Sequence, residues 1–157
     1  MTHKNSLLRP KIALFEPDIP QNTAAIVRLA ACLGLKIHII EPCGFNLDDP
    51  RFKRVAMDYI KLSKITRYRN FESFKKKNPK SRIILMTTKA KKSYLAFKFK
   101  DKDILLFGRE SSGVPDKIQK EIKDKIKIKL NKKARSLNVA MAAAIVSSEA
   151  LRQNYCL

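Results

Sequence analysis

A run of small residues near the C-terminus decides the fold of this chain. The run opens with Ala134-Arg135-Ser136-Leu137-Asn138-Val139-Ala140 and stays almost wholly apolar through Val146. Its spacing predicts a helix over about Ser136–Gln153. A surface helix shows one apolar stripe, whereas this helix is apolar on nearly every side. We therefore expect it to be covered both by its own domain and by a second copy of the chain.

A glycine-bracketed turn lies upstream of this helix. Its residues, Gly108-Arg109-Glu110-Ser111-Ser112-Gly113-Val114-Pro115, directly follow the apolar run Ile104–Phe107. This pattern predicts a strand that ends in a tight turn. Open α/β sheets bind ligands where their strands end, so the turn is a candidate binding site. An ordinary connection between a strand and a helix would give the same local pattern.

The rest of the chain alternates between apolar runs and helical periods. Strands are predicted at residues 11–15, 36–40, 63–68, 82–87, 104–107 and 126–130. Helices are predicted from Asn22 or Thr23, as the cap, to Gly34 and at residues 49–57, 71–77, 115–121 and 136–153, with residues 89–102 irregular. This alternation predicts an α/β fold with a mostly parallel sheet and helices on both faces. We expect one domain over residues 1–157, of which 1–10 form a flexible N-terminal extension.

Composition predicts a soluble cytoplasmic protein. The chain has 157 residues, of which 45% are hydrophobic and 31% are charged, as in globular rather than disordered proteins. It has no apolar run of the roughly 20 residues that a membrane span needs, and its N-terminus lacks the apolar segment of a signal peptide. Cys32, Cys43 and Cys156 show no CxxC spacing, which favours reduced thiols over disulfides or zinc. His3 and His38 form no metal-binding pattern.

The charge of the chain favours a polyanionic partner. Lysine and arginine number 34 against 14 acidic residues, for a net charge of +20. Nucleic acids fit this excess, because each neutralised phosphate releases counterions, although a lysine-rich genome would give the same bias. Arg51 and Arg54 lie close together, and Arg67 and Arg69 flank Tyr68, a pattern that suits single-stranded nucleic acid. The alternative for Tyr68 is a strand residue that packs on the core.

Taken together with Arg28, the segments 104–115 and 134–140 resemble the three signature motifs of the SPOUT RNA 2′-O-ribose methyltransferases. The resemblance extends from about Lys11 to Gln153. It implies that the C-terminal segment is threaded into a trefoil knot, which no sequence rule predicts. Within the superfamily, residues 15–23, 38–45 and 57–59 are similar to the tRNA (cytidine/uridine-34) 2′-O-methyltransferases. That subgroup modifies the wobble ribose of certain leucine tRNAs, and its members lack a separate RNA-binding domain.

The resemblance also implies a cofactor, a partner and a site. The cofactor is S-adenosylmethionine, with no metal, and the partners are tRNA and a second copy of the chain. The cofactor-binding residues implied are Met86, Thr87, Gly108, Glu110, Gly113, Ile128, Leu130, Ser136 and Leu137. The catalytic residues implied are Arg28, Glu110 and Asn138, and the RNA-binding residues are Arg28, Arg51, Arg54 and Arg135. By themselves, Met86 and Ile128 would be ordinary core residues.

Arg28, Glu110 and Asn138 have different expected roles. Arginine is too basic to act as a free base, so we expect Arg28 to orient the target phosphate and stabilise the developing alkoxide. Outside the motif it would be a solvated arginine on an amphipathic helix. Glu110 is expected to cap or fix its turn, and Asn138 to orient the cofactor loop or the substrate. Cys32 is expected in the core, which disfavours a methylase with a cysteine nucleophile.

Four positions depart from the subgroup. Arg109 stands where proline is usual, and Ser112 where a basic residue is usual. Ile128-Lys129-Leu130 replaces a usual Ile-Pro-Met, and Ser148 stands where a tyrosine is common. Three functions stay open from the sequence. They are methylation of the wobble ribose, methylation of another tRNA or rRNA ribose, and RNA binding without catalysis.

Overall fold

The structure, a computed structural model, describes residues 9–155, apart from the side chain of Met57. Most of the expected N-terminal extension, with His3, and also Cys156 lie outside the described residues. The strands are β1 (Lys11–Phe15), β2 (Lys36–Ile40), β3 (Ile65–Tyr68), β4 (Ile83–Met86), β5 (Lys92–Ser93), β6 (Ile104–Phe107) and β7 (Asp124–Lys127). They form one sheet in the order β3-β2-β1-β6-β4-β7-β5. All of its pairs are parallel, which confirms the predicted sheet type.

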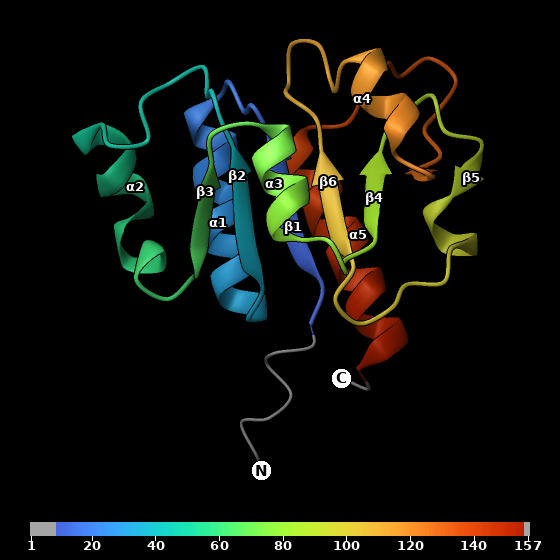
Figure 1. Cartoon of the computed structure of the whole chain (residues 1–157), viewed down its shortest axis with the longest axis horizontal. Helices are drawn as coiled ribbons and strands as arrows, with labels where there is room; N and C mark the ends of the chain where they lie inside the picture. Colours follow the sequence, from blue (N-terminus) through green and yellow to red (C-terminus); the bar gives the residue numbers. More distant parts are fainter. Residues whose placement is uncertain (1–8, 156–157) are drawn as a thin grey trace.

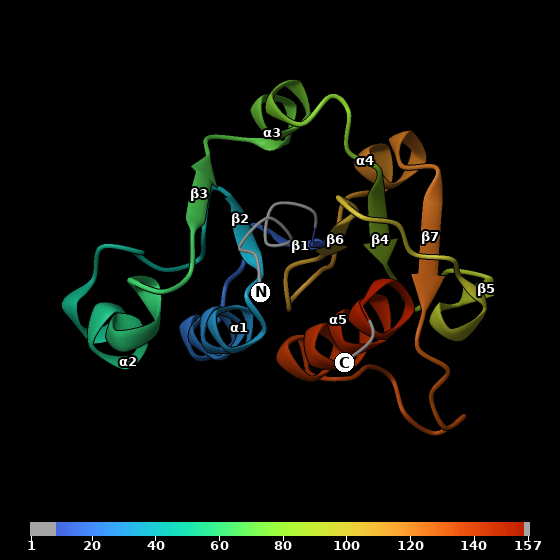
Figure 2. The same cartoon turned by 90° about the horizontal axis from the view of Figure 1, so that it is seen from below.

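Helices cover both faces of the sheet, as predicted. They are α1 (Pro20–Leu33), α2 (Pro50–Ile60), α3 (Phe71–Lys77), α4 (Asp116–Glu121) and α5 (Val139–Asn154). Figure 2 shows α1, α2 and α5 on one face and α3 and α4 on the other. This two-sided cover explains the composition of β6, in which every residue is buried. Strands of parallel sheets are continuous apolar runs for this reason.

The strand order reverses between β1 and β6. From β1 the chain adds β2 and β3 on one side, whereas β6 begins the other half of the sheet (Figure 1). Leu14 of β1 lies in register with Phe107 of β6. The segments that follow these two strands therefore leave the sheet side by side. Such a reversal opens a crevice at the carboxyl ends of the strands, where α/β proteins bind ligands.

The ends of α1 and α2 were predicted only in part. The α1 helix begins at Pro20 with Ile19 as a cap that makes no side-chain hydrogen bond, so the predicted caps Asn22 and Thr23 are wrong. Proline fits the first turn of a helix, where its missing N–H has no partner to lose. Gly34 ends α1 at φ 66°, as predicted. The α2 helix starts behind Asp49 as predicted but runs on to Ile60.

The second half of the chain required three further corrections. The α5 helix begins at Val139 rather than Ser136, because the Asn138 side chain accepts hydrogen bonds from the first turn. The β7 strand ends at Lys127, which leaves Ile128 and Leu130 in the segment that follows it. The region 89–102, predicted to be irregular, contains β5 and a 3-10 turn at Tyr94–Ala96.

Cys32 is exposed, so its predicted core position is wrong. The core face of α1 is instead made by residues 23, 24, 26, 27 and 30. This face points toward the sheet and α5. Cys32 and Arg28 lie on the opposite, exposed side of the helix. The expected burial of Cys32 therefore cannot be used as an argument against a methylase with a cysteine nucleophile.

Candidate active site

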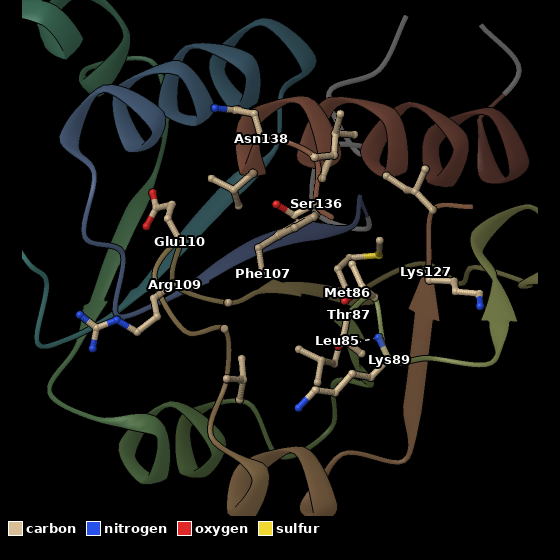
Figure 3. A pocket seen from close by; sticks show the side chains of 18 of the residues that line it. Leu85, Met86, Thr87, Lys89, Phe107, Arg109, Glu110, Lys127, Ser136 and Asn138 are labelled. Carbon is tan, nitrogen blue, oxygen red and sulfur yellow. Dashed lines mark hydrogen bonds between the residues drawn. The ribbon is translucent and has the colours of Figure 1, made fainter. Parts of the chain in front are cut away.

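A cavity of about 500 Å³ opens at the carboxyl ends of β4, β6 and β7, beside the N-terminus of α5. Pockets for small molecules commonly have this size. Figure 3 shows Met86 of β4, Phe107 of β6, and Ser136 and Asn138 of the segment before α5 around it. All nine residues expected to bind the cofactor line this one cavity: Met86, Thr87, Gly108, Glu110, Gly113, Ile128, Leu130, Ser136 and Leu137. Asn138 lines it as well.

The turn after β6 is closed by two glycines that have different roles. A Cβ on Gly108 would lie 2.7 Å from the Cα of Gly113 and 2.8 Å from its carbonyl carbon, closer than real Cβ atoms approach. Gly113 has φ 68°, a left-handed conformation that other residues adopt at a cost, and its N–H donates to the Arg109 carbonyl at 2.8 Å. The backbone therefore doubles back on itself at the cavity wall.

Glu110 joins this turn to the segment after β1. One of its carboxylate oxygens accepts a hydrogen bond from the Asp18 N–H at 2.9 Å, and the other accepts from the Asn22 amide at 3.2 Å. The Glu110 N–H in turn donates to the Asp18 carboxylate at 3.0 Å. Both carboxylate oxygens thus have partners within the protein, so the geometry favours positioning over proton transfer for Glu110.

Asn138 extends the same network to α5. Its side-chain oxygen accepts hydrogen bonds from the N–H groups of Ala140 at 2.8 Å and Met141 at 3.3 Å, and so caps the helix. Its amide nitrogen donates to the Asn22 oxygen at 3.0 Å. Asn22 therefore bridges Glu110 and Asn138. Sequence reasoning missed this role, although Asn22 lies within the quoted segment 15–23.

Arg109, one of the departures from the subgroup, faces the β1–α1 segment. Its guanidinium lies 3.4 Å from carboxylate oxygens of both Glu16 and Asp18, and its side chain points away from Met86 and Ser136 (Figure 3). Hydrogen bonding to Glu110 holds the pKa of the Asp18 carboxyl well below its usual range. Ser111 and the charge of Arg109 act in the same direction, while burial opposes them. Asp18 is consequently a fixed negative charge that anchors the turn.

The four arginines expected to bind RNA lie outside the cavity. Arg28 is exposed on α1, with its guanidinium 5.1 Å from the centre of the Tyr59 ring. Arg51 and Arg54 lie on α2 beside the β3 edge, and Arg51 forms an ion pair with Asp49 at 2.9 Å. Arg135 belongs to the segment between β7 and α5. Figure 2 shows this segment on the other side of the molecule from α2. Within one chain the structure does not bring these arginines together.

Tyr68 is buried, which excludes the interpretation that it stacks on bases. Its hydroxyl is 2.8 Å from Nδ1 of His38, and its ring packs edge-on against Phe74 at 5.3 Å. The alternative, a core residue, is correct. Arg67 is also engaged, since it pairs with Glu41 at 2.7 Å and Asp48 at 3.3 Å.

Neither a metal centre nor a membrane segment is found in the part of the chain that the structure describes. Within residues 9–155, no three His, Cys, Asp or Glu side chains are grouped so that they could hold a metal ion. No helix among these residues is both long and apolar enough for a membrane span.

Comparisons with known proteins identify the family to which the chain belongs. The model of the SpoU rRNA Methylase family matches residues 9–148. The chain therefore belongs to that family.

Individual relatives are similar over most of the chain. The chain is 44% identical over 144 residues to the tRNA (cytidine(34)-2′-O)-methyltransferase of Ancylobacter novellus, across 90% of this chain and 91% of that protein. A structure solved to study the 2′-OH methylation of C/U34 on tRNA superposes with a TM-score of 0.90 at 32% identity, covering 96% of this chain and 99% of the other. An AdoMet-bound rRNA methyltransferase from Sinorhizobium meliloti superposes with a TM-score of 0.83 at 25% identity, over 92% of this chain and 56% of the other.

Proposed function

We propose that the chain transfers a methyl group from S-adenosylmethionine to the 2′-oxygen of a tRNA ribose, at cytidine or uridine 34 of leucine tRNAs. The observation that carries this proposal is the convergence of all nine expected cofactor residues on one cavity. The relatives named for this reaction match nearly the whole chain. The proposal includes a cytoplasmic enzyme of a single domain with the trefoil knot of the superfamily.

The cavity fits the proposed cofactor. Met86, Ile128, Leu130 and Leu137 give it apolar walls, and the paired glycines bring backbone groups to its surface. Cofactor pockets combine apolar walls with a few fixed polar groups in this way. When bound, S-adenosylmethionine supplies a methyl group that its sulfonium already makes electrophilic.

The protein then has to align the ribose oxygen and assist the loss of its proton. The hydrogen-bonded series Glu110, Asn22 and Asn138 links three segments around the cavity. Arg28 is the residue proposed to hold the RNA phosphate and stabilise the alkoxide. Because Arg28 lies outside the cavity of its own chain, this role requires the RNA or a second chain to bridge the two.

A homodimer would supply that bridge. The exposed side of α5 carries Met141 and Ile145, which are 58% and 37% exposed, and Leu137 before the helix is 38% exposed. The α1 helix packs beside α5, and its exposed side carries Ala25 and Arg28. Exposed apolar patches of this kind mark interfaces, and two-fold dimers are the commonest solution. Pairing through these helices would bring Arg28 toward the cavity of the partner subunit.

The proposal is tested with purified protein, transcribed leucine tRNAs and labelled S-adenosylmethionine, with the methylated nucleotide mapped by mass spectrometry. We expect one methyl group at the ribose of nucleotide 34. Methylation at another tRNA or rRNA ribose would support the proposed reaction but contradict nucleotide 34 as its target. No binding of S-adenosylhomocysteine to folded protein by calorimetry would overturn the enzyme and favour an RNA-binding protein.

A further inference from the structure

The segment that lines the cavity after β7 has a second, outward side that is strongly basic. Ile128, Leu130, Ser136 and Leu137 line the cavity. The exposed cations Lys129, Lys132, Lys133 and Arg135 alternate with them along the chain. Residues 123–135 hold seven basic residues against one acidic residue, Asp124. The same segment thus faces the candidate cofactor with its apolar groups and solvent with its charges.

The β5 strand adds further cations beside this segment. In its pairing with β7, Lys92 lies opposite Ile126 and Ser93 opposite Lys127. The exposed Lys91 and Lys92 are therefore anchored beside β7. The Lys127 side chain is directed from β7 toward the β5 side (Figure 3). Figure 2 shows β5 and the segment after β7 on the same side of the molecule. We name Lys91, Lys129, Lys132, Lys133 and Arg135 the β5 edge surface.

The charges of the β5 edge surface are not compensated within the described chain. None of its five cations forms an ion pair with residues 9–155. On the α2 side, Arg51, Lys53 and Arg67 pair with acidic neighbours, while the exposed Arg54 and Arg69 form no ion pair with the described residues. At the cavity mouth Lys89 is likewise paired, with Asp116 at 3.5 Å. A phosphate would have to displace those carboxylates, but it would meet no competitor on the β5 edge surface.

The local backbone holds two of these lysines at an exposed tip. The Asn131 side-chain oxygen accepts a hydrogen bond from the Lys133 N–H at 3.0 Å, and the Asn131 carbonyl accepts from the Ala134 N–H at 2.9 Å. This turn presents Lys132 and Lys133 side by side. Short Asx turns of this kind restrict the free chain, so that less conformational freedom is given up when it binds.

We propose that the β5 edge surface binds the phosphate backbone of the RNA strand as it leaves the cavity. This inference rests on the proposed function, since it names the path of the RNA next to that site. It shares Arg135 with the RNA-binding residues that the resemblance implies and adds four lysines to it. It differs from the expectation at Arg51 and Arg54, which lie at the opposite edge of the sheet. Phosphate contacts fix the register of a strand without reading its bases, so the surface would supply affinity and leave target choice to the cavity.

The test compares two variants with equal loss of charge. The first carries Lys91→Gln, Lys129→Gln, Lys132→Gln and Lys133→Gln. The control carries Lys64→Gln, Lys76→Gln, Lys77→Gln and Lys80→Gln, at positions that are all exposed and lie on or near α3 and β3. Binding of fluorescent leucine tRNA is measured by anisotropy from 50 to 250 mM KCl, and binding of S-adenosylhomocysteine by calorimetry.

We expect the first variant to bind tRNA at least about tenfold more weakly at 150 mM KCl, with a salt slope lower by roughly 0.7 for each phosphate that is no longer neutralised. The control variant should stay within about threefold of the unaltered protein. Both should bind S-adenosylhomocysteine unchanged, and a Lys→Arg version of the first variant should restore tRNA binding. Equal tRNA affinities for the two Gln variants would overturn this inference alone. An unaltered protein that binds no tRNA would overturn the proposed function together with it.

Discussion

Gly108→Ala is the sharpest test of the cavity wall. The new Cβ would lie 2.7 Å from the Gly113 Cα, and two further backbone atoms of residues 113 and 114 lie within 2.9 Å. Ordinary contacts are no closer than about 3.4 Å, so the turn has to open by roughly 0.7 Å. Because the obstacle is backbone rather than a flexible side chain, the strain cannot be relieved by a rotamer change. Overpacking of this kind costs about 1–3 kcal/mol.

The expected result has two parts. The melting temperature should fall by about 2–4 °C for each kcal/mol lost in a chain of this size. Affinity for S-adenosylhomocysteine in calorimetry should fall at least about tenfold, because the displaced turn lines the cavity and carries Glu110.

Gly113→Ala is the matched control. Its Cβ would meet no atom within 4 Å, so only the cost of φ 68° remains, about 1–2 kcal/mol. Gly113→Ala should destabilise the protein, but it should lower the affinity for S-adenosylhomocysteine less than Gly108→Ala does. Wild-type stability and affinity in Gly108→Ala would refute the argument that close approach requires glycine there.

Three other predictions concern charge and burial. Asp103 is buried and held by Arg82 through two hydrogen bonds of 2.9 and 2.7 Å, so Asp103→Ala should cost about 3–5 kcal/mol in urea unfolding. Burial, reinforced by Lys11 and Lys36, lowers the pKa of His38 to about 4 from 6.5, so the folded state disfavours its protonation. Stability should be complete above pH 6.5 and fall by about 3 kcal/mol as the pH drops to 4, and this dependence should be shallower in His38→Gln. Arg28→Ala and Arg28→Lys should both abolish methyl transfer while keeping S-adenosylhomocysteine affinity, because a lysine lacks the planar fork of arginine.

Elements with local signals were predictable from the sequence. The β6 strand at Ile104–Phe107 and the α3 helix at Phe71–Lys77 have the predicted bounds, since one is a bounded apolar run and the other follows the capping box of Asn70 and Ser73. The β5 strand was missed because two residues carry no periodicity. Its existence depends on pairing with β7, more than thirty residues away in the chain.

The start of α5 shows why the boundaries were less predictable. Ser136 and Asn138 are both good caps by residue type. The structure selects Asn138, whose amide also reaches Asn22 on α1, 116 residues earlier. No local pattern contains that contact. The partners of Arg109, Glu16 and Asp18, were also not predictable locally, because they lie in the segment after β1. The bridging role of Asn22 likewise depends on contacts distant in the sequence.

The membership of the cavity was predictable only through the resemblance to known enzymes. Spacing alone marks Gly108–Gly113 as a turn and leaves Met86 and Ile128 as core residues. Their convergence on one cavity depends on the order of β4, β6 and β7 in the sheet, and no local sequence pattern predicts that order. Physical reasoning did predict that such a site lies where the strand at residues 104–107 ends. The reversal of strand order beside it became visible only in the structure.

The distribution of charge separates two tasks that an RNA-modifying enzyme must perform. Around the turn after β6, Glu16, Asp18, Glu110 and Arg109 are bound to one another, so this network holds fixed charges with more carboxylates than cations. The net charge of +20 must therefore act mainly elsewhere on the surface. Exposed charges are screened within about 10 Å at 0.1 M salt, whereas hydrogen-bonded partners in a loop are screened much less. Raising the salt concentration should consequently weaken tRNA binding steeply and leave cofactor binding nearly constant, because the groups that shape the cavity do not depend on the surplus charge.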